Sequence, residues 1–160
     1  MRQYFIPLIS NFGSVLNSLM KSIVLFVVLT FFLVACCQSF EPIDYGKDAC
    51  MHCKMTIVDK RYAAEMIDKK GKIFKFDDIA CMMHYISENK IPQMDLNLFV
   101  ADYRGHTDNF LNAHEAIYIH HEFFISPMRG NTGAFSSPAE VNSLKDSLHT
   151  IVLSWNELKY

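Results

Sequence analysis

Residues 50–55 hold two thiols and two thioethers in the order Cys-Met-His-Cys-Lys-Met. Thiolate and thioether sulfurs are soft donors, which favour Cu(I) over hard ions such as Mg²⁺ and Ca²⁺. Met55 lies two residues after Cys53, so on an extended segment both side chains point to the same side. Cys50, Cys53 and Met55 are therefore candidate ligands of a low-coordinate Cu(I) site, although a methionine more commonly packs in a core.

A cysteine pair with this spacing also occurs in zinc, haem and redox sites. Structural zinc usually takes four ligands, often from two such pairs, and this chain has one pair. Attachment of c-type haem requires histidine directly after the second cysteine, where this chain has Lys54. A thioredoxin-like pair opens a helix, but residues 56–58 are strand-like. Cu(I) is favoured, and a redox or plain disulfide and then zinc remain as alternatives.

Other donors are weaker candidates for the metal. His52 lies between the two cysteines and can either bind the ion or face solvent. Cys81 falls opposite the apolar stripe of a predicted helix, where packing is its simpler role. The remaining low-ranked candidates are His114, His120 and His121.

An apolar run over residues 23–35 follows Lys21 and ends in Leu-Val-Ala-Cys, with Cys36 last. It is shorter than the about 20 apolar residues of a membrane span and has the form of a signal-peptide core. Its end resembles the lipobox of bacterial lipoproteins. We therefore expect a lipoprotein signal peptide within residues 1–35, translated either from Met1 or from a true start at Met20, and lipidation of Cys36. The alternative is an uncleaved transmembrane anchor.

The charge balance argues against nucleic-acid binding, and the cysteine count argues against a fold held by a complete disulfide framework. The formal charge is −2, and loss of Arg2 and Lys21 with the leader makes it −4. Nucleic-acid binding requires a basic face, so this class is excluded. With Cys36 lipidated and Cys37 beside it, three of the 5 cysteines remain for the folded part. An odd number argues against a complete disulfide framework outside the cytoplasm.

Hydrophobic periodicity predicts the same order of elements twice, strand, strand, helix, strand. We expect an α+β fold made of two such small modules with mixed or antiparallel sheets. The elements are expected at residues 62–67, 72–76, 78–88 and 98–102, and again at 116–119, 134–135, 138–148 and 151–153. Asp77 is expected to cap the first helix and Ser137 the second.

The expected organisation has four parts. Residues 1–35 form the signal peptide and residues 36–47 a lipidated tether. The first module, over residues 48–104, carries Cys-x-x-Cys-x-Met. The second module takes residues 105–160.

With these motifs, the chain resembles the NosL family of copper-chaperone lipoproteins, which serve nitrous oxide reductase maturation. The matching residues are the lipobox, Cys-x-x-Cys-x-Met, and Phe-Asp-Asp-Ile at 76–79 followed by Cys81. Later matches lie at 116–119, 127–128 and 134–135. The resemblance covers about residues 48–155.

The resemblance implies a Cu(I) chaperone without enzymatic turnover, lipid-anchored to the bacterial cell envelope on the periplasmic side or in the outer membrane. It implies nitrous oxide reductase, the enzyme of denitrification, and its ABC-type assembly complex as partners, with another copper enzyme as the alternative client. It adds Met128 to the candidate ligands. The chain departs from the family pattern at Lys54 and Arg129, where the family often has glycine. A membrane-tethered thiol–disulfide oxidoreductase that keeps copper-ligand cysteines reduced remains the alternative.

Overall fold

The computed structural model describes residues 17, 20–21, 40–105 and 109–160. From residue 40 onward the described chain belongs to one compact unit. The predicted signal peptide, apart from three single positions, and the predicted lipidation site Cys36 lie outside the described residues. Among the residues that are described, no helix is both long and apolar enough to cross a membrane. The predicted boundary between modules at residues 104 and 105 stays a prediction.

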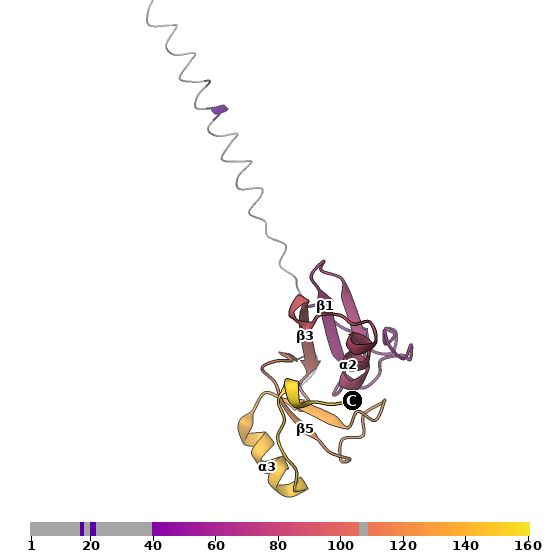
Figure 1. Cartoon of the computed structure of the whole chain (residues 1–160), viewed down its shortest axis with the longest axis vertical. Helices are drawn as coiled ribbons and strands as arrows, with labels where there is room; N and C mark the ends of the chain where they lie inside the picture. Colours follow the sequence, from indigo (N-terminus) through magenta and orange to yellow (C-terminus); the bar gives the residue numbers. More distant parts are fainter. Residues whose placement is uncertain (1–16, 18–19, 22–39, 106–108) are drawn as a thin grey trace, which may run out of the picture. The chain divides into compact units, whose positions relative to one another are not determined.

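A four-stranded antiparallel sheet in the order β2-β1-β3-β4 forms the larger part of the fold (Figure 1). Its strands are β1 (Ala64–Asp68), β2 (Ile73–Phe76), β3 (Leu96–Ala101) and β4 (Phe110–Asn112). Gly71, with φ of 80°, supplies the left-handed residue in the β1–β2 turn, a conformation that glycine adopts readily. Strand pairing thereby brings the end of β2 next to the start of β1.

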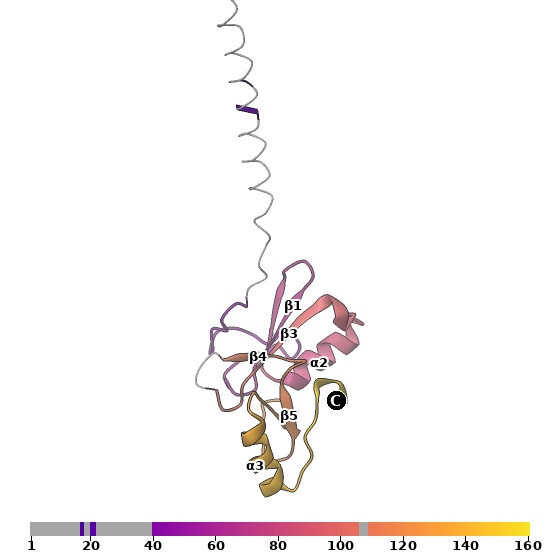
Figure 2. The same cartoon turned by 90° about the vertical axis from the view of Figure 1, so that its left-hand side faces the viewer.

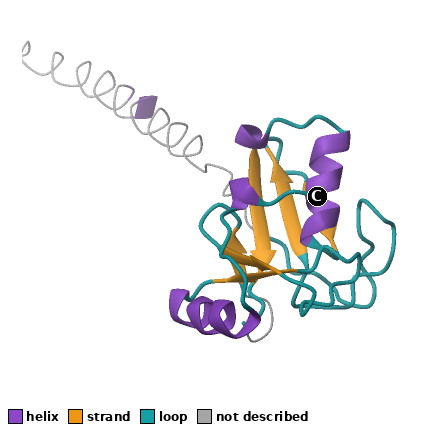
Figure 3. Cartoon of the chain, turned by 60° about the horizontal axis from the view of Figure 1, so that its bottom comes forward, coloured by secondary structure: helices purple, strands orange, loops and turns teal. Residues whose placement is uncertain are grey.

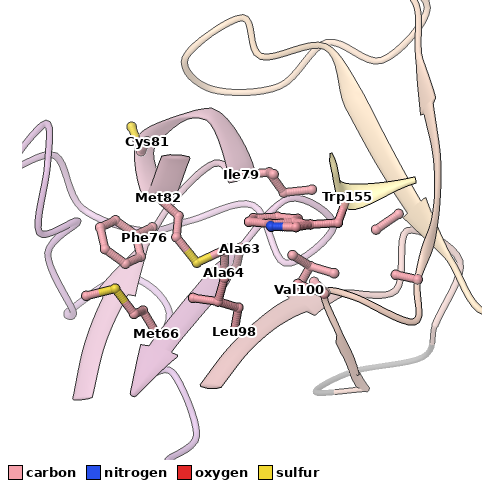
Figure 4. Close-up of a cluster of buried hydrophobic side chains, with 14 of the residues drawn as sticks. Ala63, Ala64, Met66, Phe76, Ile79, Cys81, Met82, Leu98, Val100 and Trp155 are labelled. Carbon is pink, nitrogen blue, oxygen red and sulfur yellow. The ribbon is translucent and has the colours of Figure 1, made fainter. Parts of the chain in front are cut away.

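Helix α2 (Ile79–Glu88) packs on this sheet through its apolar stripe. Figure 4 shows Met82 directed toward Phe76 and the strands, whereas Cys81 points away from them. The prediction that Asp77 caps the helix is wrong by one residue. Asp78 is the N-cap, and its side chain accepts a hydrogen bond from the Ala80 N–H at 2.9 Å. Asp77 is thereby left for another role.

The second half of the chain forms a two-stranded antiparallel sheet and one helix. These are β5 (Ile117–His120), β6 (Thr132–Phe135) and α3 (Pro138–Leu148). Their small core includes Ile119, Phe124, Phe135 and Val141. Figure 2 shows α3 beside β5, at the other end of the compact unit from the β1–β2 turn. The predicted strand at 151–153 is wrong, because only Leu153 forms a bridge, to Tyr118.

Two antiparallel sheets and two helices confirm the predicted α+β class (Figure 3). Short 3-10 helices cover Gln93–Asp95 and Trp155–Glu157. Ser137 occupies the N-cap of α3, but its side chain makes no capping hydrogen bond. The two sheets are joined where Asp102 forms a parallel bridge with Ala134.

Residues 40–47, predicted as the end of the tether, pack against the four-stranded sheet. The rings of Phe40 and Phe110 have centroids 4.5 Å apart. Ile43 is buried in the core, and the Glu41 N–H donates to Glu65 Oε1 at 3.2 Å. The folded part thus begins before the cysteine motif and fixes the segment that leads into it.

Candidate metal centre

The loop that carries the cysteine pair is closed by its own backbone. The Cys50 N–H donates to the Met55 carbonyl at 2.8 Å, and the Lys54 N–H donates to the Cys50 carbonyl at 3.0 Å. The Met51 N–H donates to the Lys75 carbonyl at 2.8 Å, which fastens the loop to β2. The pair therefore sits in a tight turn beside a sheet strand and not at a helix N-terminus.

Both departures from the family pattern fall on left-handed backbone. Lys54 has φ of 66° and Arg129 has φ of 57°. Glycine adopts this conformation at no steric cost, whereas other residues are strained by about 1–2 kcal/mol. This chain therefore places lysine and arginine at two turn positions whose backbone glycine would adopt without strain.

Two elements bring four donor atoms together. The loop provides Cys50 and Cys53, while Asp77 lies between β2 and α2 and Cys81 lies in the first turn of α2. One ligand atom from each of these residues lies within 4.8 Å of all the others. Cys53 Sγ is 3.5 Å from both carboxylate oxygens of Asp77. All three thiols are free.

The cluster is largely shielded from solvent. Cys50, Cys81 and Asp77 are at most 1% exposed, whereas Cys53 is only half-buried. Low local polarity strengthens interactions between the charged groups inside. It also means that an ion reaches the cluster from the side of Cys53.

Hydrogen bonding and burial separate the protonation behaviour of the three thiols. The Cys81 thiol donates to the Cys50 sulfur, which lowers the pKa of Cys50 to about 6. The same hydrogen bond, together with burial, raises the pKa of Cys81. Burial raises the pKa of Cys53 to about 11. One thiolate and two thiols are therefore expected at neutral pH, and a metal ion must displace protons to gain further sulfur ligands.

The donor set fits a soft ion. Three sulfurs in one small volume suit Cu(I), which thiolate ligands select. Three thiols and a carboxylate also reach the four ligands typical of structural zinc, which a single cysteine pair does not. The donor set thus suits zinc as well as Cu(I). The choice between the two ions depends on the family to which the chain belongs.

The two predicted thioether ligands lie at the surface. The exposed fraction is 55% for Met55 and 41% for Met128. The Met128 N–H donates to Asp78 Oδ2 at 3.1 Å, so its backbone is fixed beside the residue that follows Asp77. Met55 lies two residues after Cys53 in the sequence. Neither belongs to the buried donor group, and their role as copper ligands stays a prediction.

Asp78 ties the second half of the chain to the metal cluster. Besides capping α2, its carboxylate accepts from Ser126 Oγ at 2.6 Å and from the Gly130 N–H at 3.3 Å. A Cβ at Gly130 would come within 2.5 Å of Asp78 Oδ1 and 2.7 Å of the Ala80 Cβ. Glycine is therefore required for this close approach. The buried carboxylate sets where the loop bearing Met128 lies.

The sequence predicts one member of the cluster only as a helix cap and another only as a weaker ligand candidate. These are Asp77 and Cys81, the latter because it lies opposite the helix stripe. That position is correct, but the face opposite the stripe meets the cysteine loop and not solvent. Helical spacing could not have predicted the pairing of Asp77 with Cys81, because Asp77 precedes the N-cap Asp78 and lies outside the helix.

Comparisons with known proteins agree with this arrangement. The family model for NosL matches residues 43–159. The structure resembles the crystal structure of the copper chaperone NosL from Shewanella denitrificans, with a TM-score of 0.64 and 16% sequence identity. The match covers 76% of this chain and 96% of that chain. At this identity the likeness concerns the fold. The comparison with curated proteins gives no match.

Proposed function

The chain belongs to the NosL family, and from this premise we propose that it binds Cu(I) outside the cytoplasm and passes it to another protein without catalytic turnover. One observation supports this most strongly. Cys50, Cys53, Cys81 and Asp77 converge within 4.8 Å at the start of the fold. The family relationship favours copper where the donors alone also suit zinc.

The position of the donors supports binding followed by release. Cys53 is half-buried and lies between the buried thiols and the surface. Met55 and Met128 expose neutral, soft sulfurs, and backbone hydrogen bonds join Met55 to Cys50 and Met128 to Asp78. We propose that these thioethers complete the coordination of the ion while it is bound or while it leaves. Transfer then proceeds by exchange of one sulfur ligand at a time with soft ligands of the partner.

We further propose that Cys36 carries the lipid that holds the protein at the cell envelope. The lipobox-like ending of the apolar run supports this. Incorporation of a labelled fatty acid, lost in Cys36→Ala, is the expected result. A Cys36→Ala chain that keeps the label would contradict lipidation at this cysteine.

The proposed client is nitrous oxide reductase, reached through its ABC-type assembly complex. The family relationship supports this assignment. The test is transfer of Cu(I) from the loaded chain to that complex, measured after separation of the two proteins. Transfer at the rate of free copper ions, or equal transfer to an unrelated copper protein, would contradict a dedicated partnership.

The proposed metal is tested by titrating the reduced chain with Cu(I) against a competing chelator. We expect one tightly held ion per chain. A parallel titration with Zn(II) separates the two ions that the donor set suits. Tighter binding of Zn(II) than of Cu(I) under the same conditions would overturn the proposal.

One observation favours the oxidoreductase alternative. Cys50 has its pKa lowered to about 6, and reactive redox cysteines are thiolates at neutral pH. The buried position of Cys50 argues the other way, because a disulfide substrate must reach the attacking sulfur. Insulin reduction above the uncatalysed rate, together with a measured redox potential, would support the alternative; no reduction supports the chaperone.

A further inference from the structure

The thiol cluster has a second group of donors beside it, on the same two elements. His52 lies on the loop between Cys50 and Cys53. His84 follows Cys81 by one turn of α2, so both point to the same side of the helix. The two imidazole rings stack with centroids 5.7 Å apart and planes 21° from parallel.

A carboxylate completes this group. Glu88 lies one turn beyond His84 on α2, and its Oε2 is 3.5 Å from His52 Nδ1. The side chain of Glu88 is 62% exposed and that of His52 is 23% exposed. The centroid of the Tyr160 ring lies 6.3 Å from that of the His84 ring. The group therefore lies partly exposed at the surface.

We propose that His52 and His84, assisted by Glu88, bind a Cu(II) ion at a second site, distinct from the thiol cluster. Imidazole and carboxylate are harder donors than thiolate. Among the divalent first-row metals such nitrogen and oxygen sites bind Cu(II) most tightly. The proposal goes beyond Cu(I) delivery, because it assigns the oxidised ion to residues that contain no sulfur.

The ring separation allows a shared ion. An imidazole nitrogen lies about 2.0–2.1 Å from a bound metal, which places two ring centroids on one ion about 4.5 Å apart for cis ligands and about 6.4 Å apart for trans ligands. The observed 5.7 Å lies between these two values. Because the rings are now nearly parallel, they must turn about their side-chain bonds to aim a nitrogen at a common point. Within the described residues, the thiol cluster is the one group with three donors already this close, so the imidazole site closes as the ion binds.

The proposed Cu(II) site would lie at the entrance to the thiol cluster. Loop 50–53 and α2 each carry a thiol inside and an imidazole outside. Copper that arrives in its divalent state is thus held beside the thiols without entering them.

The test uses the full chain in detergent, with every thiol first occupied by Ag(I), which is soft and silent in electron paramagnetic resonance. Cu(II) is then titrated while its spectrum is recorded. We expect one ion per chain with splitting from two nitrogens. His52→Gln and His84→Gln should each weaken binding at least about tenfold, and Glu88→Gln less. The matched control is His114→Gln, whose ring packs on Trp155 away from the loop.

Two outcomes would overturn the second site. One is unchanged Cu(II) affinity in the His52→Gln/His84→Gln double variant. The other is an equal loss in the His114→Gln control. Circular dichroism verifies that each variant is folded. Cu(I) affinity of the His84→Gln variant, measured separately, distinguishes failure of this site from failure of the proposed function, because this substitution changes no residue of the cysteine loop and the thiol cluster should keep its affinity within about threefold.

Discussion

The two sets of sulfur atoms in this protein differ in their exposure to solvent. Cys50 and Cys81 are buried, and Cys53 lies half-buried between them and the surface. Met55 and Met128 leave about half of their surface in solvent. Buried thiolates are charged donors in surroundings of low polarity, where they attract a cation strongly. Exposed thioethers are neutral and mobile, so they bind more weakly and exchange faster.

The contrast suggests a division of labour. The thiol cluster sets how tightly copper is held, and the thioethers set how readily it leaves. Substitutions in the thiol cluster should therefore change mainly the Cu(I) affinity, and substitutions of the thioethers mainly the rate of copper release.

Removal of two thiols should abolish tight binding. For Cys50→Ser/Cys53→Ser we expect Cu(I) affinity to fall by at least about 1,000-fold, equivalent to about 4 kcal/mol, because a hydroxyl is a hard donor. Chelator competition under reducing conditions measures this. Cys37→Ser is the matched control and should bind as the wild type does. Wild-type affinity in the double variant would refute the site.

Removal of the third thiol tests the residue that the sequence ranked low. Cys81 donates to the Cys50 sulfur and so lowers the pKa of Cys50. Cys81→Ala removes this hydrogen bond and one candidate ligand. We expect Cu(I) affinity to fall by about 10–100-fold, with the Cys50 pKa rising toward its ordinary value. Thiol alkylation rates at several pH values measure the second effect. No change in either quantity would exclude Cys81 from the centre.

Glu65 is a buried acid on β1, outside the thiol cluster. It is 0% exposed in the middle of β1, and among the described residues no donor reaches its Oε2. Burial raises its pKa to about 7. The native state therefore keeps a proton that the unfolded state loses near pH 4.5, so this group makes stability fall as the pH rises from 4.5 to 7.

Replacement by a neutral side chain should remove that fall. We expect Glu65→Gln to be more stable than the wild type by about 2–3 kcal/mol at pH 8 and by little at pH 4. Urea unfolding of both proteins at several pH values gives the difference, from which other carboxylates cancel. A difference that does not change with pH would show that Glu65 ionises normally. Copper should leave this difference unchanged, unlike the behaviour of the thiol cluster.

Loss of a thioether should have a smaller effect on affinity and a larger one on release. For Met55→Leu and for Met128→Leu we expect about tenfold weaker Cu(I) binding, about 1.4 kcal/mol, with the fold intact. The rate of copper transfer to a chelator should change more than the affinity does. Met94→Leu is the control, since Met94 is 92% exposed and lies in the 3-10 helix Gln93–Asp95, away from the cluster. Unchanged affinity and rate in both variants would remove the thioethers from the account.

The smallest effect concerns the turn that holds the pair. Lys54 has φ of 66°, and its ammonium donates to the Met51 carbonyl. Lys54→Gly should relieve strain but lose this hydrogen bond, for a net gain of about 0.5 kcal/mol in unfolding free energy. Lys54→Ala keeps the strain and loses the hydrogen bond, so it should be destabilised. The opposite order in urea unfolding would contradict the strain argument.

Local patterns in the sequence predicted the elements well. Helix α3 (Pro138–Leu148) agrees at both ends with the prediction, because Pro138 sits at the favoured first position and the apolar spacing is clear. The β1–β2 hairpin and α2 were also predicted from alternation and helical spacing. The cysteine pair and its soft character needed no structure.

The features that the sequence did not predict depend on contacts between distant segments. Asp77 and Asp78 both suit a helix start, and sequence alone does not say which one caps. Cys81 joins the cluster only because the face of α2 opposite the stripe is covered by the cysteine loop. Glu65 lies on the face of β1 that the alternating pattern assigns to solvent, yet the segment around Glu41 covers this face. These features follow from packing and have no local signature.

The most direct test is crystallography of the reduced protein grown with Cu(I), using anomalous scattering at the copper edge. We predict one strong peak within bonding distance of at least two of the sulfurs of Cys50, Cys53 and Cys81. A fully occupied copper peak elsewhere, with these three thiols unliganded, would contradict the central claim.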